Sequence, residues 1–167
     1  NSHRHLALKV AAEGDLYGSG MIEHDMQVGH VVDERNKMGV LDNTIIVYTT
    51  DNGPEHSAKN HGGTTPFLGE KMTTYEGGVR VPMMVRWPGH IPAGQVKHGI
   101  QSHMDLFTTL ANVAGNANVV EEMKTNRKQI IDGVNNIDYW TGKSKESMRD
   151  NFLYYHESIL RAVRINQ

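Results

Sequence analysis

The 167-residue sequence contains no cysteine, which excludes both a disulfide framework and a zinc site built from thiolates. It also has no apolar run that approaches the roughly 20 residues of a membrane-spanning helix, so we expect no membrane span. The formal net charge is -2 and the basic residues are scattered, so nothing indicates a nucleic-acid partner. What remains, 38% hydrophobic and 22% charged residues, is the composition of a globular protein.

The first residues also lack the usual marks of a protein start. Residue 1 is asparagine rather than methionine, and no basic segment followed by an apolar segment resembles a signal peptide. We therefore expect the chain to begin within a longer gene product.

Hydrophobic patterns in the first half predict a helix followed by two strands. Apolar residues recur at helical spacing from Tyr17 to Met38, and Gly39 suits the left-handed conformation that ends many helices. The β-branched run 44–50 predicts a strand covered on both faces, and residues 81–87 predict a second buried strand. A polar loop, rich in glycine and threonine, joins the strands, and a loop of this length is usually functional or disordered.

The second half predicts one further helix and a small sheet. Ser102 is expected to cap a helix that extends to Ala114, with Asp105 completing a capping box and Gly115 ending the helix. The apolar face of this helix consists of Leu106, Phe107, Leu110 and Val113. Segments 151–155 and 160–165 are predicted to pair as antiparallel strands. This order of elements predicts an α/β fold with a smaller sheet at its C-terminal end.

Asp51 and Asn52 are the first candidates for a functional site because they directly follow a predicted strand. In open α/β sheets, ligands bind beyond the carboxyl ends of the strands. A carboxylate beside an amide oxygen suits Ca²⁺ or Mg²⁺, although such an ion needs more ligands than these two. The alternative is a simple turn, because Asp-Asn-Gly is a common turn sequence.

Lys71 is the second candidate, in the loop between the two strands. A lysine ammonium is a compact positive charge that can neutralise a tetrahedral anion such as sulfate or phosphate. The alternative is an ordinary solvated lysine. Further along the loop, Gly77 and Gly78 allow close approach of the backbone, and we expect Glu76 and Arg80 to form a structural ion pair.

Histidines are the third group of candidates. His3 and His5 are spaced as on one face of a strand and suit metal binding or acid–base chemistry, the alternative being a disordered tail. His56 and His61 lie in the loop between Asn52 and Lys71, where they are placed to line the same site.

Taken together, these motifs resemble the sulfatase family. The matching segments are Thr50-Asp51-Asn52-Gly53-Pro54, Gly69-Glu70-Lys71, residues 75–82, Trp87-Pro88-Gly89, the helical stretches 20–29 and 103–110, and parts of 132–164. The resemblance covers nearly the whole chain, and the order and spacing of the motifs are more specific than any motif alone.

The resemblance implies a sulfuric ester hydrolase of the arylsulfatase type. It implies that Asp51 and Asn52 are two ligands of an active-site calcium ion, with magnesium less favoured, and that Lys71 contacts the sulfate group. His5, with His3 as the competing residue, is expected beside the leaving-group oxygen, and His61 is a candidate substrate contact. The substrate class is a sulfate ester of a small molecule or a sulfated glycan, and the family's usual locations are periplasmic, secreted or lysosomal.

The resemblance also implies a fold and a missing group. Residues 1–115 are expected to belong to an alkaline-phosphatase-like mixed sheet flanked by helices, and residues 116–167 to a C-terminal region. The family's nucleophile is a formylglycine made from Cys or Ser in a C/S-x-P/A-S/T-R motif, and the sequence contains no such motif. We expect it in a preceding segment of the same protein, so that this chain alone is inactive.

Two alternatives remain open from the sequence. A phosphoester or phosphonate hydrolase of the same superfamily would use a similar cradle of metal and lysine. A truncated homologue that binds an anion or a partner without catalysis would also lack the nucleophile.

Overall fold

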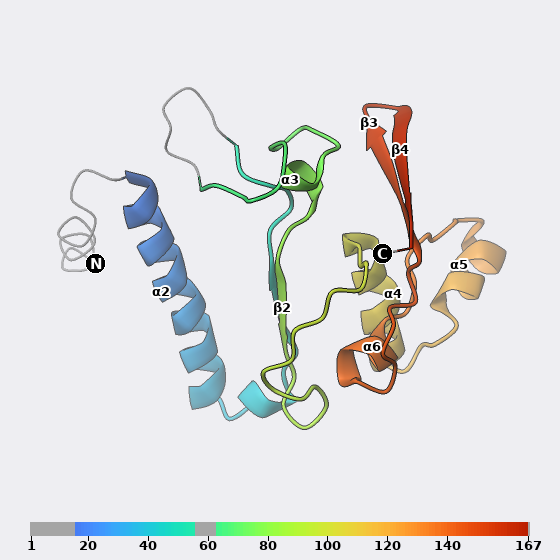
Figure 1. Ribbon diagram of the computed structural model, residues 1–167. Helices are drawn as coiled ribbons and strands as arrows, with labels where there is room; N and C mark the ends of the chain where they lie inside the picture. The colour runs from blue at the N-terminus through green and yellow to red at the C-terminus, as the bar shows by residue number, and fades with distance from the viewer. Residues whose placement is uncertain (1–15, 56–62, 167) are drawn as a thin grey trace. The chain divides into compact units, whose positions relative to one another are not determined.

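The computed structural model describes residues 16–55 and 63–166, which form two compact units that divide between Trp87 and Pro88 (Figure 1). The expected boundary between a catalytic domain at residues 1–115 and a C-terminal region at residues 116–167 refers to the longer protein, and it stays a prediction. Among the described residues, no helix is both long enough and apolar enough to cross a membrane.

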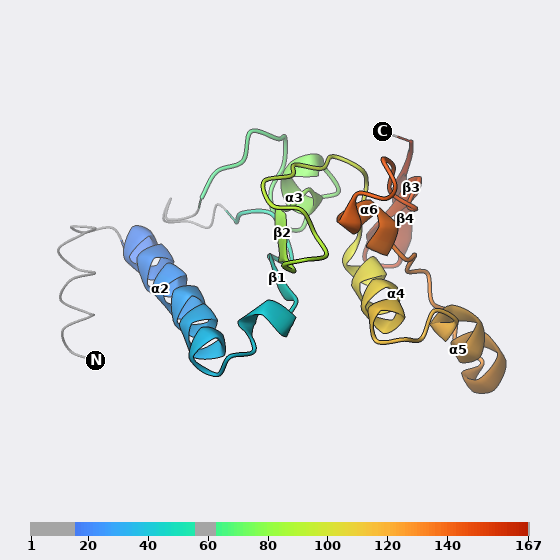
Figure 2. The same ribbon diagram turned by 90° about the horizontal axis from the view of Figure 1, so that it is seen from below.

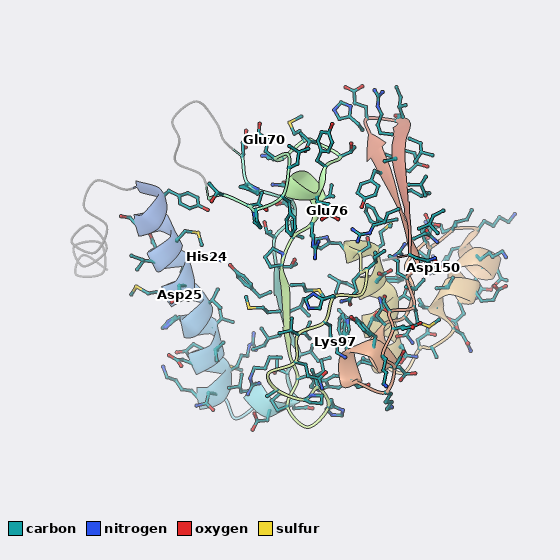
Figure 3. The ribbon with its side chains drawn as sticks, viewed as in Figure 1. His24, Asp25, Glu70, Glu76, Lys97 and Asp150 are labelled. Carbon is teal, nitrogen blue, oxygen red and sulfur yellow. The ribbon has the colours of Figure 1, made fainter. Side chains whose placement is uncertain are left out.

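The described part of the first unit begins with the predicted helix, α2, which spans Leu16–Lys37. Gly39 follows it with a left-handed φ of 69°, so the predicted end of the helix is confirmed. A short 3-10 helix, η1 (Leu41–Asn43), leads into β1 (Ile46–Thr49). The Nε2 atom of His24 on α2 lies 3.0 Å from the hydroxyl of Tyr48 on β1, and Figure 3 labels His24 on the helix.

The strands β1 and β2 (Met83–Arg86) form an antiparallel pair, in which Ile46 lies opposite Arg86 and Thr49 opposite Met83. The end of β1 therefore lies beside the start of β2, and the loop between them returns to its origin. The short helix α3 (Glu76–Val79) lies at this end of the strand pair (Figure 2).

Both strands exist as predicted, but the expectation that they are buried is wrong for the described residues. The residues of β1 are half-buried, and Met84 of β2 is 60% exposed. The reason is a lack of apolar cover, because the only large hydrophobic residues buried in the described part of the chain, Val119, Tyr139 and Trp140, all belong to the second unit.

The second unit contains three helices and a hairpin. The helices are α4 (His103–Val113), α5 (Val119–Arg127) and α6 (Ile137–Thr141), and the hairpin consists of β3 (Asn151–His156) and β4 (Ile159–Ile165). The predicted antiparallel pairing of the last two segments is confirmed, with a bulge between Tyr154 and Tyr155. The predicted capping box is also confirmed, since Ser102 accepts from the backbone of Met104 and donates its own backbone N–H to Asp105.

The predicted apolar face of α4 is not the face that packs. Phe107 is 50% exposed and Leu110 is 37% exposed, whereas Asp105, Thr108 and Thr109 are buried. The reason is that segment 132–136 packs along the polar face through hydrogen bonds. The Thr108 hydroxyl donates to the carbonyl of residue 133 at 3.0 Å, and the backbone N–H of residue 136 donates to the Thr109 hydroxyl at 3.0 Å.

Candidate functional site

The candidate site begins where β1 ends. Asp51 is exposed, and Asn52, which is half-buried, follows it in the same turn. The side-chain nitrogen of Asn52 donates to the carbonyl of Gly53 at 2.8 Å. Because the amide nitrogen makes this bond, the amide oxygen of Asn52 remains available as an acceptor. This oxygen is the atom that a hard cation would bind.

Backbone contacts between glycines bring the polar loop to this turn. The N–H of Gly53 donates to the carbonyl of Gly78 at 2.8 Å, and the N–H of Gly77 donates to the carbonyl of Leu68 at 2.7 Å. A Cβ atom on Gly53 would lie 1.7 Å from the carbonyl oxygen of Gly77, and a Cβ on Gly77 would lie 2.2 Å from that of Gly69. No side chain fits at these crossings. A Cβ atom on Gly78 would lie 2.4 Å from the carbonyl oxygen of Glu70, so the predicted close approach of the backbone at residues 77 and 78 is confirmed.

Lys71 lies in a tight turn of this loop. The Thr73 hydroxyl donates to the carbonyl of Glu70 at 2.6 Å, and Met72 has a left-handed φ of 69°, which is uncommon for a residue with a side chain. The backbone N–H of Lys71 donates to the carbonyl of Pro54 at 2.9 Å. The turn that holds Asp51 and Asn52 and the turn that holds Lys71 are therefore bonded to each other through the backbone.

The side chain of Lys71 forms an ion pair with Glu55, with 2.9 Å between Nζ and Oε2. The hydrogen bond to Glu55 and the charge of that carboxylate raise the pKa of Lys71, and the charge of Asp51 raises it further by a smaller amount. Lys71 therefore carries its full positive charge at neutral pH, near Asp51, which the family resemblance predicts to be a metal ligand.

A second ion pair supports the same loop. Nη1 of Arg80 lies 3.0 Å from Oε2 of Glu76, and the Arg80 guanidinium lies over the ring of Phe67, 4.5 Å from its centroid. This confirms the predicted structural pair, and Figure 3 labels Glu76 at α3. These contacts stabilise the returning part of the loop against its middle part at Phe67.

The structure brings together three of the five site residues predicted from the sequence, namely Asp51, Asn52 and Lys71. His5 and His61 lie outside the described residues, as do the competing candidates His3 and His56. Within the described ranges, no group of three or more acidic or histidine side chains could by itself hold a metal ion. Sequence reasoning missed Glu55, for which the only signal was an acidic residue directly after the turn at Pro54.

A profile of the Sulfatase family matches residues 12–116, which is more than half of the chain. The chain belongs to the sulfatase family. It is 40% identical to N-acetylgalactosamine-6-sulfatase of Mus musculus over 154 residues, which cover 90% of this chain and 28% of that protein. It is also 43% identical to arylsulfatase A of Homo sapiens over 100 residues, which cover 59% of this chain and 20% of that protein.

Two solved structures share the fold of this chain over most of its length. The PsFucS1 sulfatase from Pseudoalteromonas sp. superimposes with a TM-score of 0.80 at 31% identity, covering 89% of this chain and 28% of that one. Ps i-CgsB in complex with k-i-k-neocarrahexaose gives a TM-score of 0.73 at 34% identity, covering 90% and 32% of the two chains. The predicted alkaline-phosphatase-like α/β fold is thereby confirmed. This sulfatase chain spans about 28% of the length of the mouse relative.

Proposed function

We propose that this chain supplies the metal-binding turn and the sulfate-binding lysine of a longer sulfatase that hydrolyses a sulfate ester. The observation that carries the proposal is the backbone bond between the turn of Asp51 and Asn52 and the turn of Lys71. It joins two oxygen donors to a charged ammonium at the end of one strand.

The donor set fits a hard divalent cation in part. Asp51 offers a carboxylate, and the hydrogen bond of Asn52 leaves its amide oxygen as a donor, a combination that suits calcium better than a soft metal. Calcium takes about six to eight oxygen ligands, so the remaining ligands would have to come from other parts of the protein. When bound, the ion would withdraw electron density from the sulfate oxygens and neutralise charge that develops on them.

Each residue of this chain then has a defined task. Asp51 and Asn52 would hold the cation, and Lys71 would donate hydrogen bonds to a sulfate oxygen and stabilise its charge in the transition state. We assign His5 to protonation of the departing alcohol and His61 to contact with the substrate, as the family resemblance and the loop position predict. The formylglycine nucleophile would be supplied by the part of the protein that carries its motif.

For the substrate we propose a sulfated glycan. The mouse relative is named for N-acetylgalactosamine 6-sulfate, and one structural neighbour was solved with a neocarrahexaose, an oligosaccharide. These names support a carbohydrate as the alcohol half of the ester.

The test is an assay of the full-length protein with 4-nitrophenyl sulfate and with sulfated oligosaccharides, in calcium and after chelation. We expect sulfate release that requires calcium, and loss of that release when Lys71 is changed to alanine. Faster hydrolysis of 4-nitrophenyl phosphate than of the sulfate would favour the phosphoester hydrolase. Binding of sulfate esters without turnover would favour the non-catalytic homologue.

A further inference from the structure

The ion pair between Glu55 and Lys71 adds a negative charge to a site built to bind an anion. The two residues are 16 positions apart in the chain, and their side chains meet at 2.9 Å. The Lys71 side chain is 40% exposed and that of Glu55 is 56% exposed, so both are open to a ligand.

The pairing is set by the backbone rather than by two flexible side chains alone. Pro54, directly before Glu55, accepts the backbone N–H of Lys71 at 2.9 Å, and its ring fixes its own φ. On the other side of Lys71, the Thr73 N–H donates to the Glu70 carbonyl at 3.0 Å. The backbone therefore keeps residues 55 and 71 next to each other, within reach of the ion pair.

The ammonium group can serve both partners at once. Lysine has three N–H donors, and the carboxylate of Glu55 takes one of them. An anion that accepts another from the same nitrogen lies close to that carboxylate, because both oxygens are at hydrogen-bond distance from one atom. Like charges at this separation repel each other, and the repulsion grows with the charge of the anion.

We propose that Glu55 is a specificity-determining residue, whose carboxylate beside Lys71 makes the site favour singly charged sulfate esters over doubly charged phosphate esters. A sulfate monoester carries one negative charge, whereas a phosphate monoester carries about 1.5 to 2 near neutral pH. Lys71 binds either anion, and Glu55 penalises the extra charge. This inference rests on the proposed function in one respect, namely that Lys71 is the contact for the sulfate group.

The experiment compares the binding of two inhibitors of like shape to the full-length protein. Benzenesulfonate carries one negative charge and benzenephosphonate carries two at mildly alkaline pH. Their Kd values are measured by calorimetry for the natural protein and for Glu55→Gln, which keeps the size of the side chain and removes its charge. We expect Glu55→Gln to shift the ratio of the two Kd values by about fivefold in favour of the phosphonate, the size typical of an exposed charge pair.

Two further variants test whether the shift comes from the negative charge beside Lys71 and not from another effect of the substitution. Glu55→Asp keeps the charge and should leave the ratio near that of the natural protein. Glu76→Gln removes an equal charge from an ion pair of 3.0 Å in the same loop, but one made with Arg80, and should also leave the ratio unchanged. Melting temperatures of all variants establish that they are folded.

The outcomes distinguish this inference from the proposed function. An unchanged ratio in Glu55→Gln, or an equal shift in Glu76→Gln, overturns the role of Glu55 even if the protein hydrolyses sulfate esters. A shifted ratio in a protein that hydrolyses no sulfate ester supports the role of Glu55 and overturns the proposed function.

Discussion

The guanidinium of Arg149 donates hydrogen bonds to both carboxylate oxygens of Asp105, at 2.6 Å from Nη2 to Oδ1 and 2.9 Å from Nε to Oδ2. Both side chains are buried, at 8% and 2% exposure. The same carboxylate accepts the backbone N–H groups of Ser102 and Val134. One carboxylate thus joins the start of α4 to two later segments of the second unit.

We expect the change Asp105→Asn to destabilise the protein strongly. It would remove the only counter-charge that forms an ion pair with the buried guanidinium of Arg149 among the described residues, and breaking a buried pair in this way costs about 3–5 kcal/mol. The free energy of unfolding, from urea titration followed by tryptophan fluorescence, measures the effect. Glu34→Gln, which removes an exposed ion pair with Lys37, should change it by less than about 0.5 kcal/mol. Equal effects of the two changes would contradict this account.

A second prediction concerns the close backbone contact between Gly77 and Gly69, in the loop that carries Lys71. Gly77→Ala places a Cβ atom 2.2 Å from the backbone oxygen of Gly69, so the loop must move. We expect a lower melting temperature and weaker binding of sulfate, because the turn of Lys71 moves away from the turn of Asp51. Gly29→Ala is the control, since nothing lies within 4 Å of a Cβ at that helical position. This control should raise the free energy of unfolding by about 0.5–1 kcal/mol without changing sulfate binding. A similar loss of sulfate binding in both variants would contradict the role of the contact between Gly77 and Gly69.

Local signals in the sequence predicted those parts of the fold that depend on neighbouring residues. Gly39 ended α2, Ser102 and Asp105 formed the capping box, and segments 151–155 and 160–165 paired as the hairpin. The site was also predictable in part, because the family motifs at Asp51 and Lys71 fix which segments must meet.

Other features could not be predicted because they depend on partners far away in the chain. The periodicity of α4 identified Phe107 on its apolar face, but the buried residues of this helix include Asp105 and Thr109, each of which has a hydrogen-bond partner 25 or more residues later. Glu55 was missed for a similar reason. A single acidic residue in a loop forms no pattern, and only the folded backbone places it beside Lys71.

The third prediction tests the role of Lys71 in catalysis. In the full-length protein, Lys71→Ala should lower kcat/KM for a sulfate ester by about 10²- to 10³-fold, because a charged donor to the developing oxyanion is lost. The affinity for calcium should be retained. Lys37→Ala, at an exposed pair on α2, serves as the control and should leave kcat/KM unchanged. A loss of less than about threefold in Lys71→Ala would show that the ammonium does not act in the transition state.

The fourth prediction tests the metal site. Asp51→Ala should abolish calcium binding measured by competition with a fluorescent chelator, because the carboxylate is the only charged donor of this turn. Chelation of the natural protein should abolish sulfate release, and added calcium should restore it. Asp42→Asn, at an exposed pair with Arg86, should bind calcium normally. Full activity of the natural protein in excess chelator would overturn the assignment.

The last prediction concerns the pKa of Lys71. Glu55 is the main cause of the raised pKa, so Glu55→Gln should remove the upward shift of the Lys71 pKa, because desolvation lowers this pKa by more than the charge of Asp51 raises it. Because the folded-state pKa is raised, the ion pair contributes stability below the unfolded lysine pKa of about 10.4. This contribution is lost as the pH rises through the folded-state value. The pKa is measured from the Cε chemical shift of Lys71 in an NMR titration, and the same value in Glu55→Gln as in the natural protein would show that the pair does not form in solution.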